Sequence, residues 1–240
     1  MPRPDRRVVL SSIAAALAAS PLGAQAAVIE GGMPWTADRA APPPKIDPIG
    51  WRYFTSDEAA AVEALVDRLI PPDPETPGGK DCGCAVFIDR QLAGPYGSAE
   101  ALYMKGPFHD GTPQQGTQSA DPPAVHYRKA LAALDKHSQD TLHKKFAELS
   151  DEQKDGIIHD LESGKVTLGG KPMAFFQQIL KDTQQGFFAD PVYGGNRGMA
   201  SWKMVGFPGA RYDYSDWIDR HNERYPHPPV SIADHPDWNG

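Results

Sequence analysis

Hydrophobic residues recur at helical spacing over much of the chain from residue 55 to residue 188. The first such segment has the i, i+3, i+4, i+7 stripe of an amphipathic helix. Its apolar positions are Val62, Leu65, Val66, Leu69 and Ile70. Thr55 and Glu58 form a capping box at its start. Pro71-Pro72 is expected to end it.

Further helices are expected on both sides of a long loop. Asp81 is a candidate cap for a second helix, whose apolar positions are Ala85, Ile88 and Leu92. Residues 94–121 are polar and rich in Gly and Pro, which is typical of a long loop that lies against other parts of a protein. Pro122-Pro123 can start a third helix. Its inward positions are predicted to be Val125, Leu131 and Leu134.

The pattern continues with three more helical segments. One is expected to begin near Ser138, with Leu142, Phe146 and Leu149 at helical spacing. Ser150 and Gln153 form a second capping box, followed by Ile157, Ile158 and Leu161 and ended by Gly164. Pro172 is expected to open the last strong helix, with Phe175, Phe176, Ile179, Leu180 and Phe187 on its wide apolar face. Alternating strand patterns are nearly absent, so the predicted fold is mainly α, a small helical domain with long Pro/Gly-rich loops.

The chain changes character after Asp190. The stretch "DPVYGGNRGMASWKMVGFPGARYDYSDW" has neither a helical nor a strand period, and it predicts an irregular aromatic C-terminal tail. Large apolar side chains are costly to leave in water, so this tail must be held by contacts within the chain or with a partner. The candidate partner-docking residues are Tyr193, Asn196, Arg197, Trp202, Met204 and Phe207. The alternative is that these side chains pack on the chain's own helices.

The first 26 residues have the three parts of an export signal. A basic start with Arg6-Arg7 precedes a weakly apolar run too short to span a bilayer. Ala24-Gln25-Ala26 fits the A-x-A cleavage pattern. The arginine pair predicts a twin-arginine (Tat) signal, which addresses folded proteins to the periplasm. An ordinary secretory signal with a chance Arg-Arg pair is the alternative.

Composition constrains the chain beyond the signal. Residues 27–50 are rich in proline and are interpreted as a linker, which leaves 51–240 for one helical domain and its tail. The whole chain carries a net charge of −7, and because residues 1–26 contribute a net +2, the rest carries −9. An acidic surface without basic clusters argues against nucleic acid and against an anionic membrane surface as partners.

Candidate chemistry is sparse. Cys82 and Cys84 are too close in sequence for an unstrained disulfide, and two buried thiols are favoured over a bridge to another chain. The histidines are interpreted as surface residues rather than as metal ligands. Gly194-Gly195-Asn196-Arg197-Gly198 has the composition of an anion-binding loop, but it follows no predicted strand and lacks the P-loop lysine. An independent enzyme is poorly supported.

Two blocks of sequence resemble a known family. They are "FTSDEAAAVEALVDRLIPPDPETPGGKDCGCAVFIDRQLAGPYG" and "FFQQILKDTQQGFFADPVYGGNRGMASWKMVGFPGAR". Together they resemble the small subunit (subunit 3, or gamma) of membrane-associated gluconate 2-dehydrogenase and related small subunits of flavin-dependent glucose and fructose dehydrogenases. The resemblance covers most of Phe54–Arg211.

The resemblance implies a non-catalytic subunit of an oxidoreductase complex. FAD would lie in a large dehydrogenase subunit and haem c in a multi-haem cytochrome c subunit, with no cofactor in this chain. The small subunit would carry the Tat signal for its folded partner and act as an assembly or stability factor. The complex would be periplasmic and peripheral to the inner membrane, which this chain would reach only through its partners. A stand-alone periplasmic small-ligand binder, or an enzyme without a recognisable motif, is the alternative function.

Overall fold

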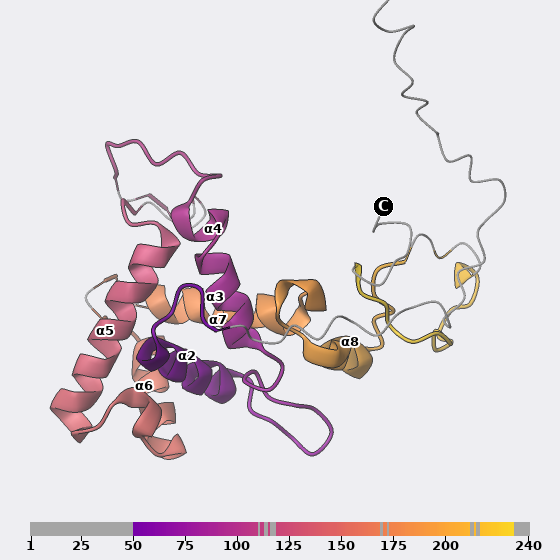
Figure 1. Cartoon of the computed structure of the whole chain (residues 1–240), viewed down its shortest axis with the longest axis horizontal. Coiled ribbons are helices and arrows are strands. Elements are labelled where there is room, and N and C mark those ends of the chain that lie inside the picture. The colour runs from indigo at the N-terminus through magenta and orange to yellow at the C-terminus, as the bar shows by residue number, and fades with distance from the viewer. Residues whose placement is uncertain are drawn as a thin grey trace, which may run out of the picture. The chain divides into compact units, whose positions relative to one another are not determined.

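The structure is a computed structural model that describes residues 50–109, 111–112, 115, 119–168, 170–171, 173–211, 214 and 217–232 (Figure 1). Within these residues the regular elements are seven α-helices and short 3-10 turns, with one isolated β-bridge and no strand. The expectation of a mainly helical fold is confirmed. The predicted signal at 1–26 and the linker at 27–50, apart from its last residue, lie outside the described residues.

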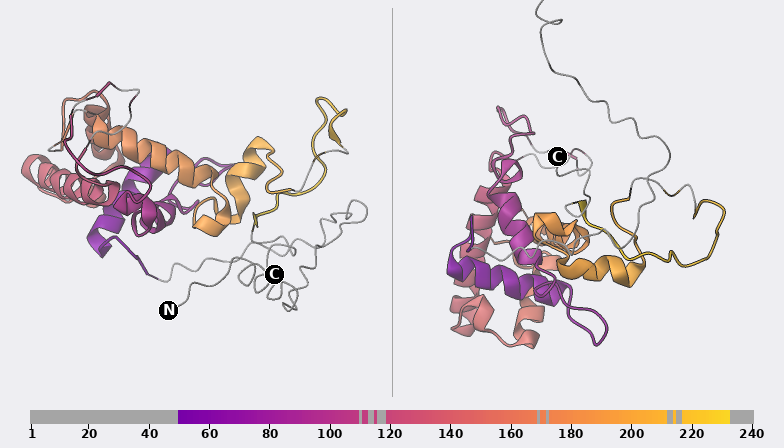
Figure 2. Two further views of the ribbon diagram at one scale, coloured as in Figure 1. Left: turned by 90° about the horizontal axis from the view of Figure 1, so that it is seen from above. Right: turned by 45° about the vertical axis from the view of Figure 1, so that its right-hand side comes forward.

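Helix α2 organises the helical body. It spans Ser56–Leu69 and contacts α3 (Cys84–Leu92), α5 (Pro123–Leu142), α6 (Asp151–Glu162) and α7 (Ala174–Phe188). One cluster of buried apolar side chains joins these helices, and its most enclosed members include Val62, Leu65, Ile88, Leu134 and Ile179. Helix α7 packs most extensively on α3 and carries the chain to α8 (Ala200–Val205). Helix α8 lies at the edge of the helical body in all three views (Figures 1 and 2).

Local capping signals set two helix starts as expected. The Thr55 hydroxyl accepts from the Glu58 N–H, and the Glu58 carboxylate accepts in return from the Thr55 N–H at 2.8 Å. Ser150 and Gln153 exchange the same pair of bonds at the start of α6. Both capping boxes are confirmed, and each satisfies two helix-end donors that have no partner inside the helix.

The start of α3 differs from the expectation. Asp81 does not cap it, because the N-cap is Gly83 in the left-handed conformation at φ 81°. A Cβ at this position would lie 2.6 Å from the Gly194 carbonyl oxygen, so the chain turns here at the residue that has no side chain. The helix nevertheless buries Ala85, Ile88 and Leu92 as predicted.

Helix α5 also differs from its prediction. No new helix begins near Ser138, because α5 runs through it to Leu142 and ends at His143 in the left-handed conformation. The buried Ser138 hydroxyl donates to the Leu134 carbonyl oxygen at 2.9 Å, which keeps it satisfied inside the helix. Phe146 is buried in a following 3-10 turn rather than in a helix.

The structure also differs from the expectations for Val125 and for the loop at 94–121, and it does not describe Pro172. Val125 does not face inward, since it is 39 % exposed, whereas Leu131 and Leu134 on the buried face of α5 do. The loop at 94–121 begins with a one-turn helix, α4 (Pro95–Ser98). Helix α7 begins at Ala174 after Met173, and Pro172, its predicted opening residue, lies outside the described residues.

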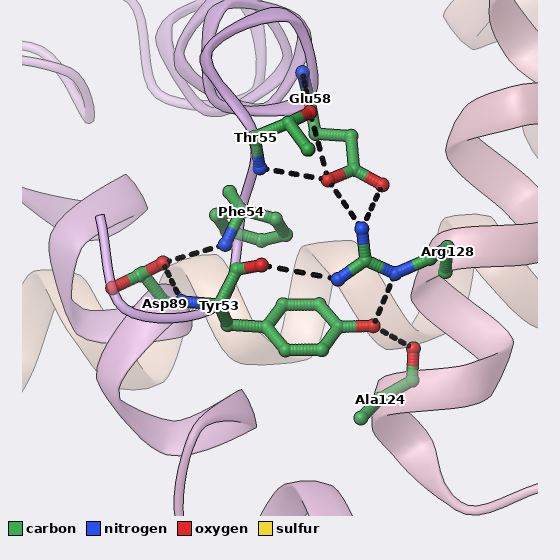
Figure 3. A network of polar contacts seen from close by, with 7 residues as sticks. All are labelled: Tyr53, Phe54, Thr55, Glu58, Asp89, Ala124 and Arg128. Carbon is green, nitrogen blue, oxygen red and sulfur yellow. Dashed lines mark hydrogen bonds and ion pairs between the residues drawn. The ribbon is translucent and has the colours of Figure 1, made fainter.

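A polar network fixes the start of the helical body (Figure 3). The buried Asp89 carboxylate on α3 accepts from the consecutive backbone N–H groups of Arg52, Tyr53 and Phe54 at 2.8–2.9 Å. Arg128 on α5 pairs with Glu58 at 2.8 Å and donates to the Tyr53 carbonyl oxygen at 3.0 Å. Since Glu58 also belongs to the capping box, the network ties the segment before α2 to three helices.

Candidate docking surface

The segment after α7 is held by close backbone packing. Gly195 lies against Gly186 of α7, where a Cβ on Gly195 would be 2.1 Å from the Gly186 carbonyl oxygen. The Arg197 N–H donates to the Cys82 carbonyl oxygen at 3.1 Å, which joins this loop to the turn before α3. Gly194 and Gly195 therefore pack against other parts of the chain's own fold. Gly198 and Gly206 are exposed, with open space around them.

Asn196 is the residue around which this loop is built. It has no exposed surface, and its backbone is left-handed at φ 45°. Its side-chain nitrogen donates to the Ala189 carbonyl oxygen at 3.0 Å. Its side-chain oxygen accepts from the Ser201 N–H at 3.0 Å and from the Ser201 hydroxyl at 2.7 Å. These bonds connect the end of α7 to the first turn of α8.

Helix α8 was not expected, because the tail has no helical period long enough to show it. Left-handed residues bound it on both sides, Met199 at φ 56° and Gly206 at φ 73°. Trp202 points back into the chain with 6 % of its surface exposed, and its indole N–H donates to the Phe188 carbonyl oxygen at 3.0 Å. The Phe207 ring packs edge-on against Trp202 with centroids 5.1 Å apart.

Asp190, just after α7, binds the tail near residues 231–232. Its carboxylate accepts from the Ser231 hydroxyl at 2.6 Å and from the Ile232 N–H at 2.8 Å. A bridge between Gly209 and Val230 closes the loop that leads there, with the Ala210 N–H donating to the Val230 carbonyl oxygen at 2.7 Å. Val230 is completely buried, so the described tail residues on both sides of this loop are part of the fold.

Around this scaffold, large apolar side chains remain exposed. They come from the end of α7, from the following 3-10 turn (Pro191–Tyr193) and from the end of α8. We call them the α8 surface: Phe188, Val192, Tyr193, Met204, Val205 and Phe207, each 38–57 % exposed. These elements adjoin one another, since α7 contacts α8 and the two 3-10 turns between them contact each other. Exposed apolar side chains on adjoining elements are typical of protein–protein contacts.

A cleft opens next to this surface. Its volume is about 390 Å³, and its walls come from α8, from the turn after it and from residues 224–229. Its lining includes Trp202, Lys203, Phe207, Arg224 and His227. This is a size that small molecules or a few side chains of another protein can occupy.

A second polar cluster lies among α4, α5 and α7. The buried Asp182 carboxylate accepts from the Tyr127 hydroxyl at 2.7 Å and from the Tyr96 hydroxyl at 3.1 Å. Burial raises the pKa of Asp182 above its ordinary value, and the two hydrogen bonds offset only part of this effect. The space beside it is only about 30 Å³, so the cluster joins helices rather than forming a ligand site.

The groups with redox or metal-binding chemistry are the two cysteines and the His, Asp and Glu side chains. Cys82 and Cys84 are free and buried, which confirms the interpretation as buried thiols, and burial raises their pKa values to about 11 and about 12. In the part of the chain that the structure describes, no three His, Cys, Asp or Glu side chains gather where they could hold a metal ion. Among the same residues, no helix is long and apolar enough to cross a membrane.

The predicted docking residues divide between the inside and the outside of the fold. Tyr193, Met204 and Phe207 belong to the α8 surface, and Arg197 is exposed. Asn196 and Trp202 are buried in the chain's own fold, so they could affect a partner only by holding the surface in place. The predicted set omits Phe188, Val192 and Val205. The pair Phe187-Phe188 nevertheless carries a signal in the sequence, because neighbouring helix residues cannot both face the core.

Comparison with known protein families identifies the family of this chain. The model of the family described as gluconate 2-dehydrogenase subunit 3 matches residues 56–209, from the start of α2 to the bridge at Gly209. The chain belongs to this family. A subunit 3 implies a dehydrogenase assembled from several different chains. Searches of curated proteins and of solved structures find no match.

Proposed function

We propose that this chain is the non-catalytic small subunit of a periplasmic, membrane-associated gluconate 2-dehydrogenase complex. Its role would be to escort a flavoprotein subunit through the Tat exporter and to stabilise it. Membership of the subunit 3 family is the observation that carries the proposal. The α8 surface supports it, because an assembly subunit needs an exposed apolar area where a partner binds.

Catalysis and cofactors are assigned to other subunits in this proposal. A large subunit with FAD would oxidise the sugar acid, and a multi-haem cytochrome c subunit would pass the electrons on. The small subunit would contact the flavoprotein through Tyr193, Met204 and Phe207 and through the exposed Arg197. Asn196 and Trp202 would hold these side chains in position from within.

Export is tested by replacing the arginine pair with Arg6→Lys and Arg7→Lys. The Tat exporter reads guanidinium groups, and lysine does not reproduce their geometry. Dehydrogenase activity is expected to disappear from the periplasm while the flavoprotein accumulates in the cytoplasm. The matched control is Arg3→Lys, which changes an arginine of the same basic segment outside the pair. Normal periplasmic activity of the double variant would exclude the escort role.

Docking is tested by Met204→Glu, which places a charge on the α8 surface at a side chain that is 49 % exposed. A charge forced into an apolar contact at the centre of an interface weakens binding by about 2 kcal/mol or more, roughly thirtyfold. The control is Leu102→Glu at a 57 % exposed side chain outside this surface. Circular dichroism verifies that both variants fold. Equal flavoprotein binding by both variants would mean that docking occurs elsewhere.

A further inference from the structure

The cleft beside α8 differs in charge from the rest of the chain. Lys203, Arg224 and His227 line it, and no carboxylate is found among its described lining residues. The whole chain is acidic, with a net charge of −7. The cleft is therefore a local concentration of cationic and imidazole groups on a protein whose overall charge would repel an acidic ligand.

Lys203 and Arg224 differ from most other described lysines and arginines in having no carboxylate partner. In the described part of the chain, neither Lys203 nor Arg224 forms an ion pair, although both are exposed. Exposed lysines on the helical body commonly do, as when Lys129 and Lys145 each bind an aspartate at 2.6 Å. The charges at the cleft are thus available to a carboxylate from outside.

The walls of the cleft are rigid and poor in backbone donors. Four prolines, Pro208, Pro226, Pro228 and Pro229, line it together with the rings of Trp202, Phe207 and Tyr225. Proline has a fixed φ and no N–H, so this part of the backbone loses little entropy on binding and cannot donate to an occupant. The Arg211 guanidinium donates to the Pro208 and Pro228 carbonyl oxygens and holds the two sides together. Lys203 and Arg224 therefore supply cationic hydrogen-bond donors for an acceptor in the cleft.

We infer that this cleft receives an acidic segment of the flavoprotein partner, with carboxylates on Lys203 and Arg224 and apolar side chains against Trp202 and Phe207. The inference rests on the proposed function. Charge complementarity supports it, as does the position of the cleft, since Phe207 belongs both to its lining and to the α8 surface. One partner can therefore cover the apolar surface and fill the cleft together.

The test is the affinity of the full chain for the purified flavoprotein subunit at about 0.05 M and about 0.5 M NaCl. The unmodified chain is expected to bind more weakly at high salt. The double variant Lys203→Glu, Arg224→Glu is expected to lose about tenfold or more in affinity at low salt and to have lost most of the salt dependence. The matched control is Lys105→Glu, Lys144→Glu, which makes the same change in net charge. It alters exposed lysines that follow α4 and α5 in sequence, helices that lie away from α8 in Figure 1.

The outcomes separate the two proposals. If the double variant at the cleft binds like the unmodified chain, or if the control pair loses as much affinity, the inference about the acidic segment is overturned while the subunit role stands. If added sodium glutamate alone fills the cleft and the flavoprotein still binds unchanged, the site takes a small anion and the inference is again overturned. If the unmodified chain does not bind the flavoprotein at either salt concentration, the proposed function itself fails.

Discussion

Gly195→Ala tests how the docking region is attached to the helical body. The new Cβ would lie 2.1 Å from the Gly186 carbonyl oxygen and 2.9 Å from the Gly186 carbonyl carbon. Both obstacles are backbone atoms of α7, so no side-chain rotation relieves the clash. The loop would have to move away from α7 and weaken the 3.1 Å bond from Arg197 N–H to the Cys82 carbonyl oxygen.

The expected cost follows from these contacts. Overpacking in a closed site costs about 1–3 kcal/mol, and a weakened hydrogen bond costs about 1 kcal/mol. We expect Gly195→Ala to lower the free energy of unfolding by about 3 kcal/mol. Urea unfolding followed by circular dichroism measures it, provided that the m-value is unchanged.

Two other glycines serve as controls. Gly156, in the middle of α6, has nothing within 4 Å of the position that a Cβ would take, so Gly156→Ala is expected to stabilise the chain by up to about 1 kcal/mol. Gly198 is equally open but has φ +63°, so Gly198→Ala is expected to cost about 1 kcal/mol through backbone strain alone. If Gly195→Ala unfolds at the same urea concentration as the unmodified chain, the close contact between this loop and α7 does not exist.

Three further substitutions have defined outcomes. Burial raises the pKa of Asp182, so the protonated form of this side chain stabilises the fold. This stabilisation is complete below the ordinary aspartate pKa of about 4, and it is lost as the pH rises through the raised pKa. Asp182→Asn should therefore flatten the fall in unfolding free energy above about pH 4, measured by urea unfolding at a series of pH values. Asp89→Asn leaves at least one of three backbone N–H groups, together with the Arg90 guanidinium, facing an amide donor. It should cost about 2–3 kcal/mol, with faster hydrogen exchange at residues 52–54. Trp202→Phe leaves the Phe188 carbonyl oxygen without its donor and should lower the free energy of unfolding by about 1–3 kcal/mol.

Each of these outcomes can fail in a distinct way. An unchanged pH profile in Asp182→Asn would mean that this carboxyl titrates in the fold as it does in the unfolded chain. Unaltered exchange at residues 52–54 in Asp89→Asn would mean that these N–H groups are held by something else. A Trp202→Phe variant as stable as the unmodified chain would place the indole in solvent or in a partner rather than in the chain's own fold.

The sequence was most reliable for features that depend on interactions between residues close together in the chain. The capping boxes at Thr55 and Ser150 involve partners three residues away, so local residue types were enough to place both helix starts. The stripe along α2 likewise requires only a period in the sequence. The mainly helical class followed from the same signals.

The errors come from contacts between distant parts of the chain. Gly83 starts α3 because Gly194 lies against it, a contact that joins residues far apart in the sequence and leaves no local mark at Asp81. Ser138 looked like a helix start because a free serine hydroxyl caps helices well, yet here its hydroxyl is satisfied by the Leu134 carbonyl oxygen inside α5.

The composition of the sequence indicated where the candidate docking region lies but not which of its side chains are exposed. A run rich in Gly and aromatic residues indicated contacts without saying which side chains face inward. Trp202 and Met204 lie two residues apart on α8, so they point to different sides, one into the chain and the other into solvent. Left-handed residues at both ends of α8 interrupt any helical period, which is why this short helix could not be predicted.

The central claim is that this chain travels and assembles with a flavoprotein dehydrogenase. The most direct test is to isolate the full chain through an affinity tag from the periplasm of the native cell and to record the flavin absorption and the masses of the proteins that accompany it. We predict a large flavin-containing subunit in a fixed ratio to this chain, together with dehydrogenase activity on a sugar acid. Recovery of the chain alone, without flavin and without a second subunit, would contradict the account.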